Sequence, residues 1–527
     1  MNNEDVLFQR TVFRSWLVIF GLFLFLFLMA PSFAIASGKN KADPYVRFQD
    51  VVAKAKALAE GSFQPPGQDL PDVLKKMGYD QWRDIHFKPA NSLWFNEPFS
   101  VQFFHPGFLY QHPVTVHYVD QAGTHLVSFS PNFFQYAGTD LKGALLGDYG
   151  FAGFRIHYPL NTPQYADELV AFLGASYFRA LGRGLAYGMS ARGLAINTAE
   201  DTGEEFPLFR EFWLVHPSSG AKSITFYALL DSESVTGAYE FIVTPGEETL
   251  MKVSSVLYVR GHIEKLGLAP LTSMFCYGEN TGFKGSSDFR PEVHDSDGLL
   301  LRTQSGEWLW HPLVNPQKLL INAFAGMPMG FGLIQRDIKF DHYQDLEARY
   351  EKRPSVWVTP KGDWGKGHLE LIQLPTETEY NDNIGAYWVP ERALEHGDTL
   401  QFAYTLSWHA AQKPRSSQGF VESTRIVKKS DGAMFLIDFL GDEFKTVLAN
   451  RTIDPDVWVS QGARITSSQL IKNTATGGWR LVIHIQLDNP GLIEGLLPTQ
   501  KPSIEMRAFL KSKDLPVTET WSYTYLP

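Results

Sequence analysis

The stretch SITFYALLDSESVTGAYEFIVTPGEETLMKVSSVLYV (Ser223–Val259) predicts the fold class. It contains three runs rich in β-branched and aromatic residues, at 223–230, 239–245 and 252–259, with polar, Gly- and Pro-containing segments between them. Short runs of this kind, bounded by turn residues, are typical of antiparallel strands. Further runs of this kind lie at 98–105, 115–119 and 369–374. We therefore expect a mainly β protein whose N-terminal part is a large β-sandwich.

A second domain is predicted after the polar, turn-rich segment 389–401. The strand-like runs beyond it are FAYTLSWH (402–409), AMFLIDFL (433–440), ARITSSQLI (463–471), WRLVIHIQL (479–487), IEMRAFL (504–510) and TWSYTYL (520–526). Trp479, Leu481, Ile483, Ile485 and Leu487 alternate with other residues, which is the period of a half-buried strand. Turn residues at 430–432 and 476–478 predict hairpins. We expect domains at 37–390 and 391–527, the second of them immunoglobulin-like.

Helical patterns are concentrated early in the chain. Residues 45–61 have apolar residues at helical spacing and end at a glycine, and 69–78 form a shorter segment of the same kind, capped by Asp69. In TPQYADELVAFLG (162–174), Thr162 is placed as an N-cap, Pro163 follows at the first helical position, and a glycine ends the run. These three segments are predicted to be helices.

The N-terminus predicts export. Trp16–Ala30 is an apolar run of signal-peptide length that follows Arg10 and Arg14, and Ala34-Ile35-Ala36 supplies a cleavage site. Residues 1–36 are therefore expected to be a cleavable Sec-type signal peptide, with an uncleaved anchor as the alternative. Cys276 is the single cysteine of the chain, so no intramolecular disulfide can form, and its apolar surroundings indicate a buried thiol. An exported protein of this size without disulfides fits a bacterial periplasm.

The composition and the absence of several known motifs argue against some classes of protein. The net charge of −10 and the absence of a basic stripe argue against nucleic-acid binding. No metal-binding spacing of His or Cys is present, so neither a metal nor a cofactor is expected. Phe, Tyr and Trp make up 14% of the chain, which is high. Most of these rings should serve a β-rich core, and the remainder could stack on a ring-shaped ligand such as a sugar.

Carboxylates occur beside aromatic residues in three stretches. The first, 290–310, contains Asp295, Asp297, Glu307, Trp308 and Trp310; the second, 336–357, contains Tyr350, Arg353 and Trp357; the third, TETEYNDNIGAYW (376–388), contains Glu379 and Asp382. Two carboxyl groups placed on either side of a glycosidic bond are the minimum that glycoside hydrolysis requires, one as acid and one as base. The acid needs a raised pKa, which apolar and acidic neighbours both favour. Ordinary solvated turns are the alternative explanation.

Several blocks resemble a known family. They include LGASYFRALGRG, TGEEFPLFREFW, RPEVHDSDGL, RPSVWVTPKGDWGKG and NDNIGAYW. Together they are similar to the periplasmic osmoregulated glucan biosynthesis protein G/D family, over roughly residues 45–527, and nearer its G branch. The resemblance implies a galactose-mutarotase-like β-sandwich (a supersandwich) joined to an immunoglobulin-like domain. It also implies a role in making periplasmic glucans with a β-1,2-linked glucose backbone.

The resemblance further implies an inverting endo-β-1,2-glucanase activity on linear β-1,2-glucan. By this resemblance, Asp382 occupies the position of the general acid. Asp295 occupies the position of a second essential carboxylate, which acts as the base through water and substrate hydroxyls. Glu379 and Tyr350 match positions that line the same cleft, and Arg353, from the same stretch as Tyr350, is expected to bind substrate as well. Trp308, Trp310 and Trp357 are placed as stacking platforms for sugar rings. A membrane glucan synthase is a possible partner, and a homodimer is possible.

Two other functions stay open. A non-catalytic protein could hold nascent glucan and hand it to a membrane synthase or branching enzymes, with the immunoglobulin-like module as the docking surface. A mutarotase-like epimerase would interconvert anomers without shortening a chain.

Overall fold

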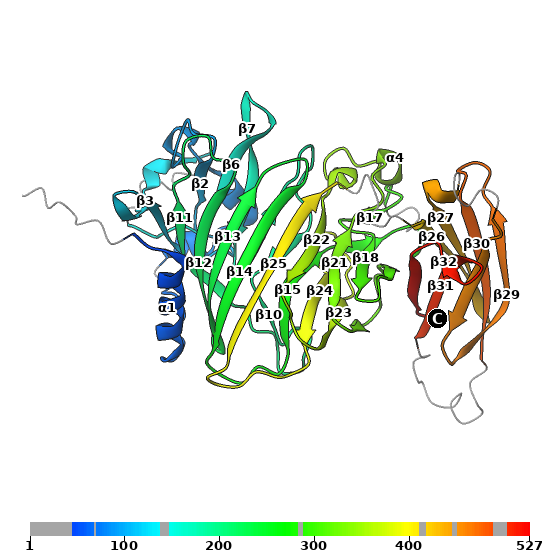
Figure 1. Cartoon of the computed structure of the whole chain (residues 1–527). Coiled ribbons are helices and arrows are strands. Elements are labelled where there is room, and N and C mark those ends of the chain that lie inside the picture. The colour runs from blue at the N-terminus through cyan, green and yellow to red at the C-terminus, as the bar shows by residue number, and fades with distance from the viewer. Residues whose placement is uncertain are drawn as a thin grey trace, which may run out of the picture. The chain divides into compact units, whose positions relative to one another are not determined.

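The chain folds mainly into β-strands, as the sequence predicts (Figure 1). The computed structural model describes residues 45–67, 70–137, 147–282, 288–410, 418–444, 451–488 and 503–527. The predicted signal peptide, residues 1–36, and the predicted cap Asp69 lie outside the described residues. Within the described ranges, no helix has both the length and the apolar character that a membrane crossing would require.

One large sheet has fifteen strands in the described part of the chain. Its order is β28-β31-β33-β19-β18-β21-β22-β25-β14-β13-β12-β11-β3-β4, with β32 beside β31. The strands are β3 (Thr115–Asp120), β4 (Gly123–Leu126), β11 (Leu208–Val215), β12 (Ile224–Asp231), β13 (Val235–Thr244), β14 (Thr249–Val259), β18 (Gly298–Thr303), β19 (Trp308–Pro312), β21 (Pro328–Ile334), β22 (Ser355–Lys361), β25 (Thr399–His409), β28 (Asp454–Val459), β31 (Ile504–Ser512), β32 (Leu515–Pro516) and β33 (Thr520–Tyr525). The three runs within Ser223–Val259 form β12, β13 and β14, which pair antiparallel as predicted.

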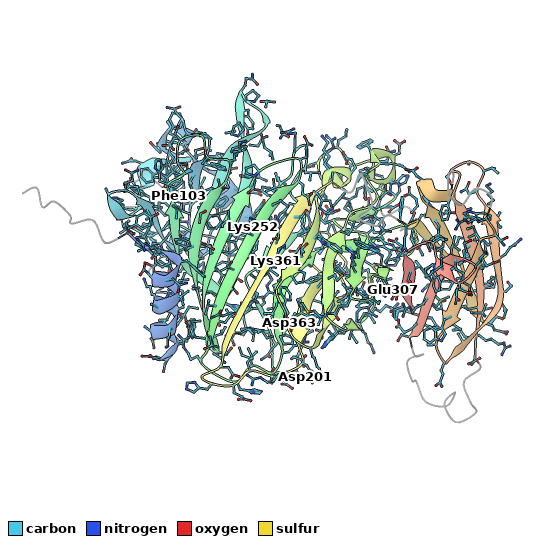
Figure 2. All side chains as sticks on the ribbon, viewed as in Figure 1. Phe103, Asp201, Lys252, Glu307, Lys361 and Asp363 are labelled. Atoms are coloured by element: carbon cyan, nitrogen blue, oxygen red, sulfur yellow. The ribbon has the colours of Figure 1, made fainter. Side chains whose placement is uncertain are left out.

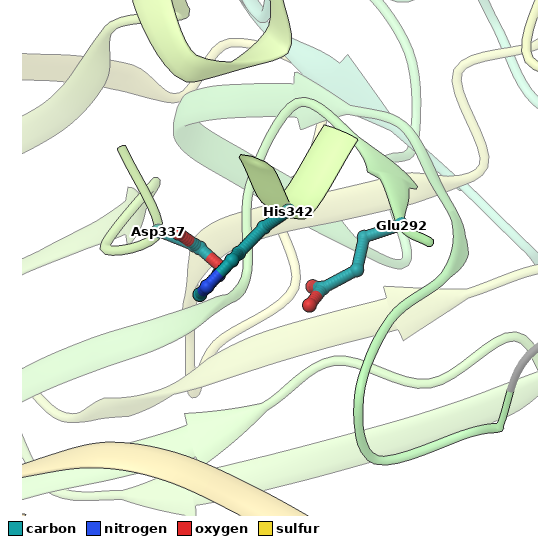
Figure 3. A group of neighbouring side chains, drawn as sticks. All are labelled: Glu292, Asp337 and His342. Atoms are coloured by element: carbon teal, nitrogen blue, oxygen red, sulfur yellow. The ribbon is translucent and has the colours of Figure 1, made fainter. Parts of the chain in front are cut away.

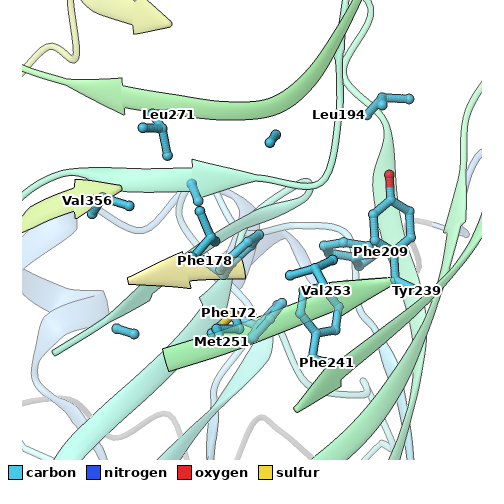
Figure 4. Packing of buried hydrophobic residues seen from close by; sticks show 14 of the residues in the cluster. Phe172, Phe178, Leu194, Phe209, Tyr239, Phe241, Met251, Val253, Leu271 and Val356 are labelled. Carbon is cyan, nitrogen blue, oxygen red and sulfur yellow. The ribbon is translucent and has the colours of Figure 1, made fainter. Parts of the chain in front are cut away.

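A second sheet has ten strands, in the order β2-β6-β7-β8-β9-β15-β24-β23-β20, with β10 beside β15. They are β2 (Ser100–Phe104), β6 (Gly153–Thr162), β7 (Tyr165–Leu173), β8 (Tyr177–Ala180), β9 (Ser190–Arg192), β10 (Ala195–Ile196), β15 (Leu266–Ser273), β20 (Leu320–Ala325), β23 (Gly367–Gln373) and β24 (Ile384–Pro390). The main core contains rings from both sheets. Phe172 and Phe178 of β7 and β8 lie 5.2 and 5.5 Å, between ring centroids, from Phe241 of β13 (Figure 4). Packing of two sheets face to face is the sandwich that the sequence predicts.

The remaining strands form smaller sheets. The four-stranded sheet has the order β26-β27-β30-β29, and two short pairs are β1-β5 and β16-β17. They are β1 (Ile85–Phe87), β5 (Phe134–Tyr136), β16 (Phe275–Tyr277), β17 (Val293–His294), β26 (Phe420–Lys429), β27 (Gly432–Leu440), β29 (Ala463–Lys472) and β30 (Trp479–Leu487). Leu481, Ile483 and Ile485 are buried, as their alternation predicts, in a core shared with Met506 and Trp521 of β31 and β33. Both predicted hairpins are present.

Helices are short in the described residues. They are α1 (Phe48–Ala59), α2 (Asp72–Lys75), α3 (Tyr79–Arg83) and α4 (Phe340–Tyr343), with 3-10 turns η1 (Pro89–Asn91), η2 (Pro131–Phe133), η4 (Tyr350–Lys352) and η5 (Asp442–Phe444). The predicted helix within 45–61 is confirmed as α1, whose Val51 and Ala55 pack against Trp213, Leu229 and Ala238 of the fifteen-stranded sheet. The segment 69–78 contains α2.

The predicted helix at 162–174 is wrong. This segment forms the end of β6 and the whole of β7, which pairs antiparallel with β6 and β8. Leu169, Val170, Ala171 and Phe172 are buried in succession, which a one-sided surface helix would not allow. The good helix formers of this segment are overruled by tertiary pairing.

One strand lies in a different part of the fold from the one expected. FAYTLSWH was predicted to open the C-terminal domain, but it belongs to β25, which pairs with β14 and with β22 along nearly its whole length. A strand hydrogen-bonded on both sides belongs to the sheet that it joins. The direct neighbours of β25 are therefore strands from before residue 391, although the same sheet also contains C-terminal strands, and the division of the chain into two domains stays a prediction.

Candidate functional site

Asp382 lies in the connection between β23 and β24. The next residue, Asn383, fixes the base of this connection. Its side-chain amide donates to the Leu374 and Phe275 carbonyls (2.9 and 3.1 Å), and its side-chain oxygen accepts from the Phe275 N–H (2.8 Å). Asn383 is 3% exposed, so it orders the backbone beside Asp382 from within the fold.

Asp382 is exposed as a residue, yet burial by the surrounding protein raises the pKa of its carboxyl group. The residue is accessible to solvent while protein atoms surround its carboxyl group closely enough to disfavour the charged form. The positive charge of Arg179, on β8, acts in the opposite direction and lowers this pKa. A carboxyl group with a raised pKa that is also accessible to solvent has the properties of a general acid.

Asp295 lies between β17 and β18 and is buried. Its N–H donates to the Met274 carbonyl (2.8 Å), and one carboxylate oxygen lies 3.3 Å from Nε of Arg353. Burial raises the pKa of Asp295, Arg353 lowers it, and the negative charge of Asp382 raises it again. The charge of Asp382 therefore acts on Asp295, and the charge of Arg179 acts on both carboxyl groups.

Glu379 and Tyr350 extend this group. The Tyr350 hydroxyl donates to Glu379 (3.2 Å), and the Arg353 guanidinium lies 5.2 Å from the centre of the Tyr350 ring. Arg290 forms an ion pair with Glu379 (2.6 Å). The sequence has no cation near Glu379 along the chain, but the fold supplies one from 89 positions away (379 minus 290). Arg290 also contacts Asp288 and Asp345, so it is shared among three carboxylates. Burial is what raises the pKa of Asp382.

Five of the eight predicted site residues are therefore linked in one group by these contacts and charges: Asp295, Tyr350, Arg353, Glu379 and Asp382. Sequence reasoning missed Arg179 and Arg290. Arg179 lies within the strand-like run SYFRAL, where nothing in the local pattern distinguishes it from Arg183 nearby. Only the pairing of β8 with β7 and β9 places it beside the carboxyl groups.

The three predicted tryptophans lie elsewhere, in strands of the fifteen-stranded sheet. Trp310 is 4% and Trp357 is 5% exposed, and the Arg336 guanidinium covers the Trp310 ring at 3.6 Å. Trp308 packs against Trp357, with ring centroids 5.6 Å apart. The burial of Trp310 and Trp357 leaves little ring surface for a sugar, although Trp310 lines the cavity described below. Trp308 is partly buried and packs against the same core. The role of all three as platforms stays a prediction.

A second polar group lies next to Asp295 in the sequence. His294 is buried with Nε2 3.0 Å from Glu292 and Nδ1 3.1 Å from Asp297. Although burial opposes its charge, Asp297 and Glu292 raise the pKa of His294 to about 9. Its Nδ1 also faces the side-chain oxygen of Gln335 (3.0 Å), whose amide donates to the Tyr350 carbonyl (3.1 Å). This network therefore connects the segment that contains Asp295 with the backbone of Tyr350.

Glu292, Asp337 and His342 are the described residues that could hold a metal ion (Figure 3). One donor atom from each lies within 4.8 Å of the others. Hydrogen bonds already account for this arrangement, because Nδ1 of His342 bonds to Asp337 and Glu292 bonds to His294. The three side chains line a cavity of about 440 Å³ together with residues of β26 and β27.

Comparison with known proteins decides the family. Residues 46–525 match the family model described as "Periplasmic glucan biosynthesis protein, MdoG". The chain belongs to the periplasmic glucan biosynthesis protein family. It is also similar to the "Glucans biosynthesis protein G" of Ralstonia nicotianae (strain ATCC BAA-1114 / GMI1000), with 44% identity over 492 residues, covering 91% of this chain and 95% of the relative. As a periplasmic glucan biosynthesis protein, the chain has a role in glucan biosynthesis, with glucan as its partner and the periplasm as its compartment.

Proposed function

We propose that this glucan biosynthesis protein is an endo-β-1,2-glucanase that cleaves linear β-1,2-glucan with inversion at the anomeric carbon. In this proposal Asp382 protonates the glycosidic oxygen, and Asp295 accepts a proton from the attacking water, through substrate hydroxyls or a further water. A cleavable signal peptide at residues 1–36 delivers the chain to the periplasm. The β-1,2 linkage rests on the family resemblance of the sequence.

The observation that carries this proposal is that burial raises the pKa values of both Asp295 and Asp382, that the charge of Asp382 acts on Asp295, and that Asp382 is exposed to solvent. Two like charges close together cannot both form easily, so one group tends to keep its proton. A glycosidase needs such a pair, with one group protonated and one ionised. Glu379, Tyr350 and Arg353 supply hydrogen-bonding groups for sugar hydroxyls beside it.

The proposal is tested by incubating the purified mature chain with linear β-1,2-glucan and following product length by chromatography. The wild type should shorten the glucan, and Asp382→Asn should reduce the rate by about 10²–10⁴-fold, since it removes the proton donor while keeping the shape of the side chain. Glu377→Gln is the matched control, because Glu377 is an exposed carboxylate of the same connection. Proton NMR of early products should show the α anomer.

Two results would contradict the proposal. Products that retain the β configuration would exclude an inverting mechanism. If the wild type leaves the glucan intact while calorimetry shows that it binds, the chain is a protein that holds glucan for a synthase or branching enzyme. Asp382→Asn should then bind glucan as well as the wild type does.

A further inference from the structure

The outward face of β28 and β31 carries an unusual set of side chains. One face of this strand pair points into the core. It contains the buried residues Leu510, Ala508 and Met506 of β31, which pair with Pro455, Val457 and Val459 of β28. Because successive side chains of a strand alternate between faces, the intervening residues point away from this core. These are Asp456, which is paired with Phe509, and Trp458, which is paired with Arg507.

The four outward side chains line one pocket of about 350 Å³, formed by Asp456, Trp458, Arg507 and Phe509. Trp458 is 52% exposed. A single exposed ring is common on protein surfaces, but Trp458 shares one pocket with a second aromatic ring, a carboxylate and a guanidinium. An aromatic face also attracts the weakly positive C–H groups of one side of a sugar ring.

The charges of the pocket are balanced within the protein. Asp456 forms an ion pair with Lys511 (2.7 Å), and Arg507 forms one with Glu307 (2.6 Å), the residue labelled in Figure 2. The pocket therefore offers no net charge to attract a strongly acidic or basic partner. Its carboxylate and guanidinium groups still have sites for hydrogen bonds with hydroxyl groups. An aromatic platform flanked by balanced polar groups matches a neutral, hydroxyl-rich ligand.

We propose that Trp458, Phe509, Asp456 and Arg507 form a second glucan-binding site that holds sugar rings of the same polymer away from Asp382. This inference rests on the proposed role in handling glucan, but not on cleavage. Rings stack on Trp458 and Phe509, and Asp456 and Arg507 bond to their hydroxyls. A glucan that is long enough to occupy both sites should bind more tightly than a glucan that occupies one site. The reason is that its second contact forms within the same complex.

The test compares glucan binding in a background that does not cleave. Calorimetry with linear β-1,2-glucan should show that Asp382→Asn/Trp458→Ala binds with a Kd about 2- to 12-fold higher than Asp382→Asn alone, the loss expected for one aromatic contact. Leu515→Ala in the same background is the matched control, because Leu515 is 69% exposed in the neighbouring strand β32 but does not line the pocket. Its Kd should not change. Trp458→Phe should give a smaller loss than Trp458→Ala.

Two outcomes would overturn the second site. One is an unchanged Kd after Trp458→Ala; if the mass in solution also changes, this face is a contact between copies of the chain. The other is that Asp382→Asn does not bind glucan at all. Cleavage by the otherwise unmodified chain is measured separately, so a failure of the glucanase proposal is distinguishable from a failure of this one.

Discussion

Arg179 is the cation whose charge acts on both candidate catalytic carboxyl groups. It lowers the pKa of Asp382 and also that of Asp295, while burial raises both. Its Nε donates to the Ser190 hydroxyl (2.8 Å), which orients the guanidinium. Arg179 therefore influences the pH range in which one carboxyl group is protonated and the other ionised, together with burial and, for Asp295, with Arg353 and Asp382.

Replacing Arg179 by Gln should move the whole pH profile of cleavage toward higher pH. Loss of the positive charge raises the pKa of the acid Asp382, so the alkaline limb shifts upward. It also raises the pKa of the base Asp295, which must be ionised, so the acidic limb shifts in the same direction. The measurement is kcat/KM against pH for both proteins.

Arg179→Lys provides the control for charge, since it keeps the cation and should leave both limbs near their original positions. If Arg179→Gln lowers the rate equally at every pH, Arg179 binds substrate and does not tune the carboxyl groups.

Part of the candidate site could be predicted at this scale. Asp295, Glu379 and Asp382 stand out in the sequence because acids in short connections beside aromatic residues suggest polar chemistry. The tryptophans could not be placed, because the same residue type serves a core or a platform according to what covers it. Trp310 is covered by Arg336, which is 26 positions further along the chain (336 minus 310).

Among the elements, β21 and β22 approach each other closely at Gly332. A methyl group at this position would lie 2.1 Å from the Val356 carbonyl oxygen and 3.0 Å from Cα of Trp357. These are backbone atoms of the paired strand, so they cannot turn aside as a flexible side chain could. The close pairing of these strands therefore depends on glycine.

Gly332→Ala should lower the free energy of unfolding by about 3 kcal/mol, since two paired strands must move apart. Gly385→Ala on β24 is the matched control, because its nearest contact would be Cβ of Ile372 at 3.8 Å. That variant should stay within about 1 kcal/mol of the wild type. Urea unfolding of both variants measures the difference, and equal stabilities would show that the strands adjust at no cost.

Elements with strong local patterns were predictable, and those decided by distant pairing were not. The runs of Ser223–Val259 alternate and are bounded by turns, so each strand is visible in its own residues. The segment of β7 contains Ala, Glu and Leu in helical numbers, and only its pairing with β6 and β8 makes it a strand. β25 has an ordinary strand pattern, but which sheet it joins depends on β14 and β22.

At the scale of the whole molecule, Arg336 and Glu519 join distant parts of the chain. The guanidinium contacts both oxygens of Glu519 (2.5 and 3.0 Å) and donates to the Val421 carbonyl (2.7 Å). The Val421 N–H in turn donates to Glu519 (2.7 Å). Glu519 is 1% exposed, so its charge is compensated only inside the protein.

Arg336→Met should lower the free energy of unfolding by about 3–5 kcal/mol at neutral pH, because it leaves a buried carboxylate without its partner. Adding Glu519→Gln should restore part of this loss, since the amide oxygen can still accept from Val421. Arg392→Met is the control, because Arg392 pairs with Asp398 at the surface and its side chain is 73% exposed. This variant should lower the free energy of unfolding by less than about 1 kcal/mol. If Arg336→Met/Glu519→Gln is less stable than Arg336→Met, removing the charge of Glu519 restores nothing, and the two residues stabilise the fold independently.

The fifteen-stranded sheet sets an order in time as well as in space. Leu309 and Trp310 of β19 pair in parallel with Thr520 and Trp521 of β33, which belong to the last residues of the chain. Synthesis proceeds from the N-terminus, so β19 exists long before its neighbour does. Until β33 arrives, that side of β19 has unpaired backbone groups, which is the exposed edge that invites aggregation. The sheet is therefore completed at β19 by a strand that is synthesised 211 positions later (520 minus 309), and removal of β33 would leave this edge open.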